Sequence, residues 1–198
     1  MRGARPLTTD EETRLLQSYT GLYHNRDRLF YLLCRWTGAR VSQALYLKVR
    51  DVYDGRRALD LVYFPRQSRK GKREGQAMPL KPVVQEAITA WMADLQTWGL
   101  LTPELPLFVS QVRAKDGSAK ALDRHTATRE LQARCEALGF TGRLSSHTAR
   151  KTFARHVYQR SGHNLITCQR ALGHANIQTT LSYLSVADED VFAAILAD

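Results

Sequence analysis

The sequence predicts an α+β protein that is mostly α-helical, with one small antiparallel β-sheet. Helical periodicity with recognisable helix caps recurs along most of the chain, whereas only residues 58–64 and 76–80 have the pattern of strands. A basic segment, residues 66–73, separates these two runs and is short enough to connect them as a hairpin. Helices therefore dominate the expected fold, and the sheet is limited to this hairpin.

Helix signals begin close to the N-terminus. Thr9 and Glu12 have the spacing of a capping box, so we expect the first helix to begin there. A second helix is predicted over residues 26–37 and should end at Gly38, because glycine readily takes the left-handed conformation that closes a helix. A short helix over residues 42–48 should follow.

The middle of the chain predicts two longer helices. Pro82 is well placed to open the first, whose apolar side chains recur at four-three-four-three spacing. These are Val84, Ile88, Trp91, Leu95 and Trp98. Residues 100–117 are expected to be mostly loop. Asp123 should cap the second helix, which is expected to run to Leu138 and stop at Gly139.

The last third of the chain is expected to be helical. Helices are predicted over residues 147–160, over 165–172, over a short segment that contains Tyr183, and over an amphipathic tail at 188–196. The first three have candidate caps, which are Ser146, Asn164 and Asn176.

Composition narrows the class of protein. The chain has 198 residues, of which 43% are hydrophobic and 24% are charged, and this is typical of one globular domain. No apolar run reaches the length of about 18 residues that a membrane span needs. Three distant cysteines, Cys34, Cys135 and Cys168, match no metal or redox spacing, so we expect buried reduced thiols in a cytoplasmic protein. The net charge of +10 modestly favours a polyanionic partner.

Several side chains could carry chemistry. Arg40 lies between Gly38 and the next predicted helix, and His147 and Arg150 are three residues apart, hence on one helix face. His174 lies nine residues before Tyr183. Each feature alone is more often a solvated face or ordinary packing, and only their order and spacing together indicate a functional site.

In this order the segments resemble the catalytic domain of the tyrosine recombinase, or phage integrase, family. The resemblance covers nearly the whole chain, from Leu7 to the tail, and the matching segments carry all the catalytic positions of the family. They are Thr37-Gly38-Ala39-Arg40, a lysine in the hairpin, His147-Thr148-Ala149-Arg150, Leu172-Gly173-His174 and Tyr183. The resemblance implies the fold of that catalytic domain and a site-specific DNA recombinase, an enzyme of the kind found in mobile elements.

The lysine is the least certain position. Lys70, just before Gly71, matches the family pattern best, and Lys72 is the reserve candidate. The alternative is a basic loop that touches phosphates without taking part in the chemistry. The other basic residues of the segment are expected to bind DNA, and they are Arg66, Arg69, Lys72 and Arg73.

The residue types suit transfer of a DNA strand. Arg40 and Arg150 can each offer paired donors to the scissile phosphate and stabilise the charge of the transition state. The resemblance implies that Tyr183 attacks, forms a 3′-phosphotyrosine and releases a 5′-hydroxyl. His147 would then exchange a proton with the tyrosine, His174 would bind the phosphate and Lys70 would act as general acid. The covalent ester retains the bond energy, so neither ATP nor a cofactor or metal is expected.

The chain departs from the family pattern in two respects. Gln43 stands where a glutamate is frequent, which predicts a site that is more electropositive or less rigid. Family members usually carry a separate N-terminal core-binding domain, and we expect it to be absent here, so that residues 1–198 form a single catalytic domain. The chain would then be either a short natural recombinase or a catalytic fragment.

The expected partners are double-stranded DNA and further copies of the chain, which would form a tetramer on paired DNA sites. An accessory DNA-binding protein is possible, and DNA binding would bring the protein to the nucleoid. Two other functions stay open, a catalytically weak DNA-binding or regulatory protein and an activity of the type IB topoisomerase kind. The target sequence and the choice between integration, excision, inversion and resolution also stay open.

Overall fold

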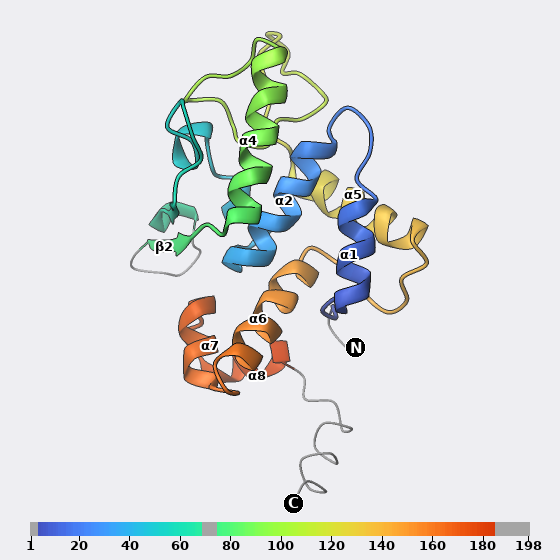
Figure 1. Cartoon of the computed structure of the whole chain (residues 1–198), viewed down its shortest axis with the longest axis vertical. Coiled ribbons are helices and arrows are strands. Elements are labelled where there is room, and N and C mark those ends of the chain that lie inside the picture. The colour runs from blue at the N-terminus through green and yellow to red at the C-terminus, as the bar shows by residue number, and fades with distance from the viewer. Residues whose placement is uncertain (1–3, 69–74, 185–198) are drawn as a thin grey trace, which may run out of the picture. The chain divides into compact units, whose positions relative to one another are not determined.

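The computed structural model describes residues 4–68 and 75–184, which form two compact units, residues 1–152 and 153–198 (Figure 1). The boundary between the units falls within helix α6. The elements of the first unit are α1 (Thr9–Gln17), α2 (His24–Thr37), α3 (Val41–Ala44), the 3₁₀ helices η1 (Val49–Asp51) and η2 (Arg66–Ser68), β1 (Leu61–Phe64), β2 (Gln76–Pro79), α4 (Pro82–Thr97) and α5 (Arg124–Ala137). They are followed by α6 (Thr148–Arg160), α7 (Leu165–Leu172) and α8 (Ile177–Leu184).

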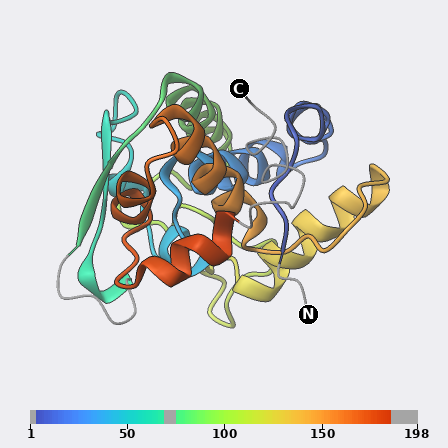
Figure 2. The same ribbon diagram turned by 90° about the horizontal axis from the view of Figure 1, so that it is seen from below.

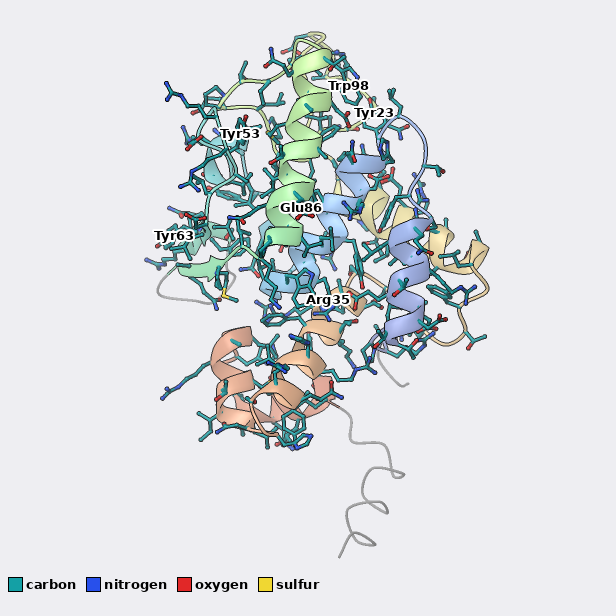
Figure 3. The ribbon with its side chains drawn as sticks, in the orientation of Figure 1. Tyr23, Arg35, Tyr53, Tyr63, Glu86 and Trp98 are labelled. Carbon is teal, nitrogen blue, oxygen red and sulfur yellow. The ribbon has the colours of Figure 1, made fainter. Side chains whose placement is uncertain are left out.

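The core of the first unit lies between α2 and α4, which pack side by side (Figure 1). Trp91 of α4 is fully buried, and its indole Nε1 donates to the carbonyl of Leu107 at 2.7 Å. Tyr23, at the start of α2, lies edge-on to Trp98 at the end of α4, with 5.4 Å between ring centroids (Figure 3). The apolar stripe predicted for α4 is therefore the face that forms the core.

The two strands form the expected hairpin and the only sheet among the described residues. Strands β1 and β2 pair antiparallel, with Val62 opposite Met78. Val62 and Phe64 are buried, whereas Leu61 and Tyr63 are exposed on the other face, as the alternation of a strand requires. The hairpin and α5 lie on opposite sides of the α2–α4 pair (Figure 2).

Most predicted helix ends are confirmed, because they depend on local backbone chemistry. Gly38 closes α2 and Gly173 closes α7, each in the left-handed region with φ of 66° and 62°. The side chains of Asp123 and Asn164 accept hydrogen bonds from the first turns of α5 and α7.

Several predicted boundaries are wrong. The capping box of α1 uses Thr8 and Glu11, one residue before the expected pair, because the chain already turns into helix at Thr9. The helix expected over 42–48 is only the single turn of α3, since Lys48 leaves it to pair with Pro106 as an isolated bridge. The first strand is shorter than predicted, because Ala58 instead pairs with Tyr53 in a separate bridge.

The second unit contains the rest of α6 with α7 and α8, and the last two helices pack against each other. Cys168 of α7 is buried, and its thiol donates to the carbonyl of Ala154 at 3.5 Å. All three cysteines are buried and outside disulfides, as expected. No helix among residues 4–68 and 75–184 is both long and apolar enough to cross a membrane.

Candidate active site

Arg40 occupies a short turn between two helices of the first unit. The left-handed Gly38 ends α2, and Arg40, in an extended conformation, is the residue directly before α3. Its backbone N–H donates to Oε1 of Gln43 at 2.9 Å, and Gln43 is buried. The neutral amide of Gln43 thus caps the turn and binds the backbone of Arg40.

Arg150 is brought to the same turn from α6. It is only 3% exposed, and its Nη1 donates a hydrogen bond to the carbonyl of Gly38, two residues before Arg40. Because both residues belong to the first unit, the prediction that Arg40 and Arg150 lie together is supported by a direct contact between their segments.

His147 lies in the turn that leads into α6, not within the helix as predicted. Its backbone N–H donates to Oγ of Ser145 at 3.2 Å, and the next residue, Thr148, begins α6. Ser145 also contacts Thr148, whose hydroxyl accepts from the backbone N–H of Ser145 at 3.0 Å. This local network, rather than a cap by Ser146, orders the start of α6.

An open hollow of about 320 Å³ lies beside these residues. Its lining residues come from three segments of the first unit, namely Arg40, Val41, Ser42, Arg124, Ser146 and His147. The pKa of His147 is lowered from its usual value. The largest cause is partial burial, which removes water from the charged imidazolium, and the positive charges of Arg150, Arg40, Arg124 and Lys151 add to it. The neutral imidazole is therefore favoured in a strongly electropositive site, where it can accept a proton.

The second unit holds two further predicted site residues, His174 and Tyr183. The rings of His174 and Tyr183 meet edge-on with 5.0 Å between their centroids, and Nδ1 of His174 lies 3.0 Å from Oγ1 of Thr180. Gly173 ends α7 directly before His174, and Tyr183 lies on α8. The Leu-Gly-His segment and the tyrosine are thus neighbours within this unit.

Several predicted residues lie outside the part of the chain that the structure describes. These are Arg69, Lys70, Lys72, Arg73 and the helical tail at 188–196. Arg66 is described, and it is exposed at the start of η2, directly before that basic segment. Within the described ranges no group of three or more His, Cys, Asp or Glu side chains could hold a metal ion.

Arg124 is a basic lining residue that the sequence did not predict, and neither did it predict the uncharged lining residues Val41, Ser42 and Ser146. Arg124 is the first residue of α5, next to the predicted cap Asp123, and more than 80 residues separate it from Arg40. The sequence held a weak signal for Arg124. A basic residue in the first turn of a helix is unfavourable beside the positive end of the helix dipole, so its presence there indicates a role other than helix stability.

The chemistry that this arrangement suits is the binding of a phosphodiester. Guanidinium groups bind phosphate oxygens in paired geometry, and a neutral imidazole beside them can take a proton from a hydroxyl.

Comparison with known proteins points the same way. A tyrosine recombinase of Pseudothermotoga lettingae is 30% identical over 172 residues, which are 87% of this chain and 54% of that protein. Tyrosine recombinase XerD of Mycobacterium leprae is 32% identical over 92% of this chain and 57% of its own length. The chain thus spans little more than half the length of these relatives.

Solved structures share the fold. The XerH site-specific recombinase bound to palindromic difH substrate superposes with a TM-score of 0.71 at 23% identity, over 96% of this chain and 52% of that chain. The catalytic domain of bacteriophage HP1 integrase superposes with a TM-score of 0.56 at 18% identity, over 97% of this chain and 94% of that chain. The described architecture is thus that of a tyrosine recombinase catalytic domain. The pattern of the phage integrase family matches residues 5–190, so the chain belongs to this family.

Proposed function

We propose that the protein is a site-specific DNA recombinase, which cleaves and rejoins strands through a covalent 3′-phosphotyrosine at Tyr183 without ATP. The observation that carries the proposal is the hydrogen bond from Arg150 to the carbonyl of Gly38, which joins the two arginine segments beside a hollow that His147 also lines. The named recombinases among its relatives support the same activity.

Each group has a role that its surroundings favour. Arg40 and Arg150 would neutralise the non-bridging oxygens of the scissile phosphate as negative charge grows in the transition state. The Tyr183 hydroxyl would attack phosphorus and pass its proton to His147, whose neutral form is favoured by the lowered pKa.

The bond from phosphorus to the 5′ oxygen would break as the tyrosyl ester forms. Lys70, the preferred general acid over Lys72, would protonate the leaving oxygen. His174 would bind the phosphate. Attack by a 5′-hydroxyl of a partner strand would reverse these steps and free the tyrosine, so that the number of phosphodiester bonds is unchanged.

The proposed partner is double-stranded DNA, with Arg66, Arg69, Lys72 and Arg73 binding its backbone. Recombination needs paired sites, so we also propose a tetramer of this chain, helped where necessary by an accessory DNA-binding protein. Through DNA the protein would associate with the nucleoid. No observation favours the two alternatives, a non-catalytic DNA-binding protein or a topoisomerase.

A nicked suicide substrate tests the proposal. A nick next to the cleavage position lets the short 5′-ended fragment diffuse away, so the covalent intermediate accumulates. Because the amino-acid sequence does not specify the DNA target, the substrate is a pool of nicked duplexes with randomised flanking bases. The wild-type chain should form an adduct that survives denaturing electrophoresis, and Tyr183→Phe should form none.

Tyr158→Phe is the matched control, because Tyr158 belongs to the same unit and packs against His163. It should leave adduct formation unchanged. An adduct that persists in Tyr183→Phe, or a wild-type chain that traps no member of the pool, would refute the proposal.

A further inference from the structure

The hollow has a basic side chain that the proposed chemistry does not use. Arg40, which lines the hollow, and Arg150, which lies beside it, account for the scissile phosphate, yet Arg124 also lines the hollow from α5, together with the hydroxyl-bearing Ser42 and Ser146. Arg124 is exposed, and the chemistry proposed above gives it no role.

Arg124 is not there to stabilise its own helix. A positive charge in the first turn is unfavourable beside the partial positive charge of the helix N-terminus. The adjacent carboxylate of Asp123 is already engaged, accepting from the backbone N–H groups of His125 at 2.9 Å and Thr126 at 3.0 Å and from Oγ1 of Thr126 at 2.5 Å. No ion pair joins a carboxylate to Arg124 or to Arg40 within the described residues.

The helix that presents Arg124 is held firmly. The guanidinium of Arg26 on α2 is fully buried, and its Nη2 lies 3.1 Å from the carboxylate of Glu130 on α5. The same guanidinium contacts Asp27 at 2.7 Å and donates to the carbonyl of Val109 at 2.8 Å. Because this network ties α5 to α2, Arg124 projects from a fixed element rather than from a loop.

We propose that Arg124, with the hydroxyls of Ser42 and Ser146, forms a second phosphate subsite that binds a phosphodiester next to the scissile one. The inference rests on the proposed function and deepens it, because a DNA strand carries one phosphate for about every 3.4 Å of helix axis and so presents several to one basic hollow. Arg124 would set the register of the strand, whereas Arg40 and Arg150 bind the reacting group. The lowered pKa of His147 supports this placement, since Arg124 is among its causes.

Binding measurements on Tyr183→Phe, which prevents cleavage, isolate the subsite. In this background, Arg124→Gln should weaken binding of a duplex from the trapped pool about tenfold. The slope of log affinity against log salt concentration should become shallower by about one, the value for one lost phosphate contact. Arg124→Lys should keep the salt slope but recover only part of the affinity. Arg56 is an exposed arginine of the same unit that lies outside the hollow. Arg56→Gln in the Tyr183→Phe background should therefore have the same affinity and salt slope as Tyr183→Phe alone.

A neutral methylphosphonate, placed in turn at each phosphate near the nick, locates the contact. At one position next to the scissile phosphate it should weaken binding by the chain with Arg124 and leave the Arg124→Gln chain unaffected. Equal salt slopes for the two chains, or the absence of any such position, would overturn the subsite.

The cleavage rate separates this inference from the proposed function. With Tyr183 intact, Arg124→Gln should form less adduct than the wild type at limiting nicked duplex, and a higher duplex concentration should narrow this difference, because the loss lies in binding. A loss of rate at saturation without a change in affinity would also overturn the subsite. If the wild-type chain traps no DNA, the proposed function fails instead.

Discussion

Arg40 and Arg150 have parallel proposed roles but are held in different ways. Arg150 is almost fully buried and its guanidinium is fixed by the Gly38 carbonyl, so little side-chain entropy remains to be lost on binding phosphate. Arg40 is partly exposed and is fixed through its backbone by Gln43, which leaves its side chain more freedom. The guanidinium of Arg150 is therefore held in place before phosphate binds, whereas that of Arg40 can still change its conformation to fit the phosphate.

The lowered pKa of His147 predicts how the rate of DNA cleavage depends on pH. Its pKa lies below the usual 6.5, so the base form persists as pH falls through neutrality and is lost only at more acidic pH. The rate of adduct formation in single turnover should therefore be flat near pH 7 and decline below pH 6.5. His147→Gln should slow it by about 10²–10⁴-fold and remove the acidic decline.

His163→Gln serves as the control, because His163 packs against Tyr158 in the second unit and belongs to no proposed step. Its pH profile should equal that of the wild type. A profile in His147→Gln with the same acidic decline would show that another group is the base.

At the scale of elements, an N-terminal strap (residues 4–8) holds both ends of the segment that carries His147 and Arg150. Nε of Arg5 donates to the carbonyl of Thr141 at 2.7 Å, and the backbone N–H of Leu7 donates to Oγ1 of Thr152 at 3.0 Å. Leu7 is fully buried, so the strap is part of the unit's core rather than a loose end.

The ion pair of Arg5 with Glu11 makes this strap sensitive to acid. The hydrogen bonds from Arg5 lower the pKa of Glu11 to about 2. A carboxyl whose pKa is lower when folded adds stability above its unfolded pKa of about 4.5, and this stability is lost as pH falls toward 2. Arg5→Gln should therefore lower the free energy of unfolding at pH 7 by about 1 kcal/mol, the modest value expected for a partly solvated pair.

Chemical denaturation between pH 2 and pH 7 measures this effect. The difference between Arg5→Gln and the wild type should shrink as pH falls from about 4.5 to 2. Arg57→Gln is the control, because its pair with Asp60 at 3.4 Å is well exposed and should contribute little. A difference that is independent of pH would contradict a role for Glu11 ionisation.

At the scale of the whole molecule, the proposed chemistry draws on both units. Arg40, His147 and Arg150 belong to residues 1–152, whereas His174 and Tyr183 belong to residues 153–198. The net charge of +10 fits a protein whose proposed partner is a polyanion, and it predicts binding that weakens steeply with salt.

The proposed tetramer can be tested separately from the chemistry. The tail at 188–196, expected from the sequence to be an amphipathic helix, has Val191, Phe192, Ile195 and Leu196 as its apolar positions, and we propose that they dock on a neighbouring copy. A chain that ends at Val186 should lose the complex that joins two DNA sites, seen by gel shift, while it still traps a covalent adduct on a single site. Paired-site complexes of unchanged yield would argue against this role of the tail.

The sequence by itself was enough for features that depend on neighbouring residues. Gly38, Gly173, Asp123 and Asn164 end or cap helices as predicted, because the left-handed glycine and the capping side chain act within one turn. The order and spacing of the catalytic segments likewise identified the family. Boundaries without such a strong local signal, such as the end of α3, were predicted less well.

Only the tertiary structure decided which distant groups line the hollow or lie beside it. Arg150 bonds to Gly38 across 112 positions, and Arg124 joins Arg40 and His147 because a buried network fixes α5 to α2. Such contacts arise from packing, and packing depends on the summed burial of many side chains rather than on a motif. The residue types proposed for catalysis could therefore be predicted from the sequence, whereas the electropositive hollow and its extra arginine depend on the tertiary fold.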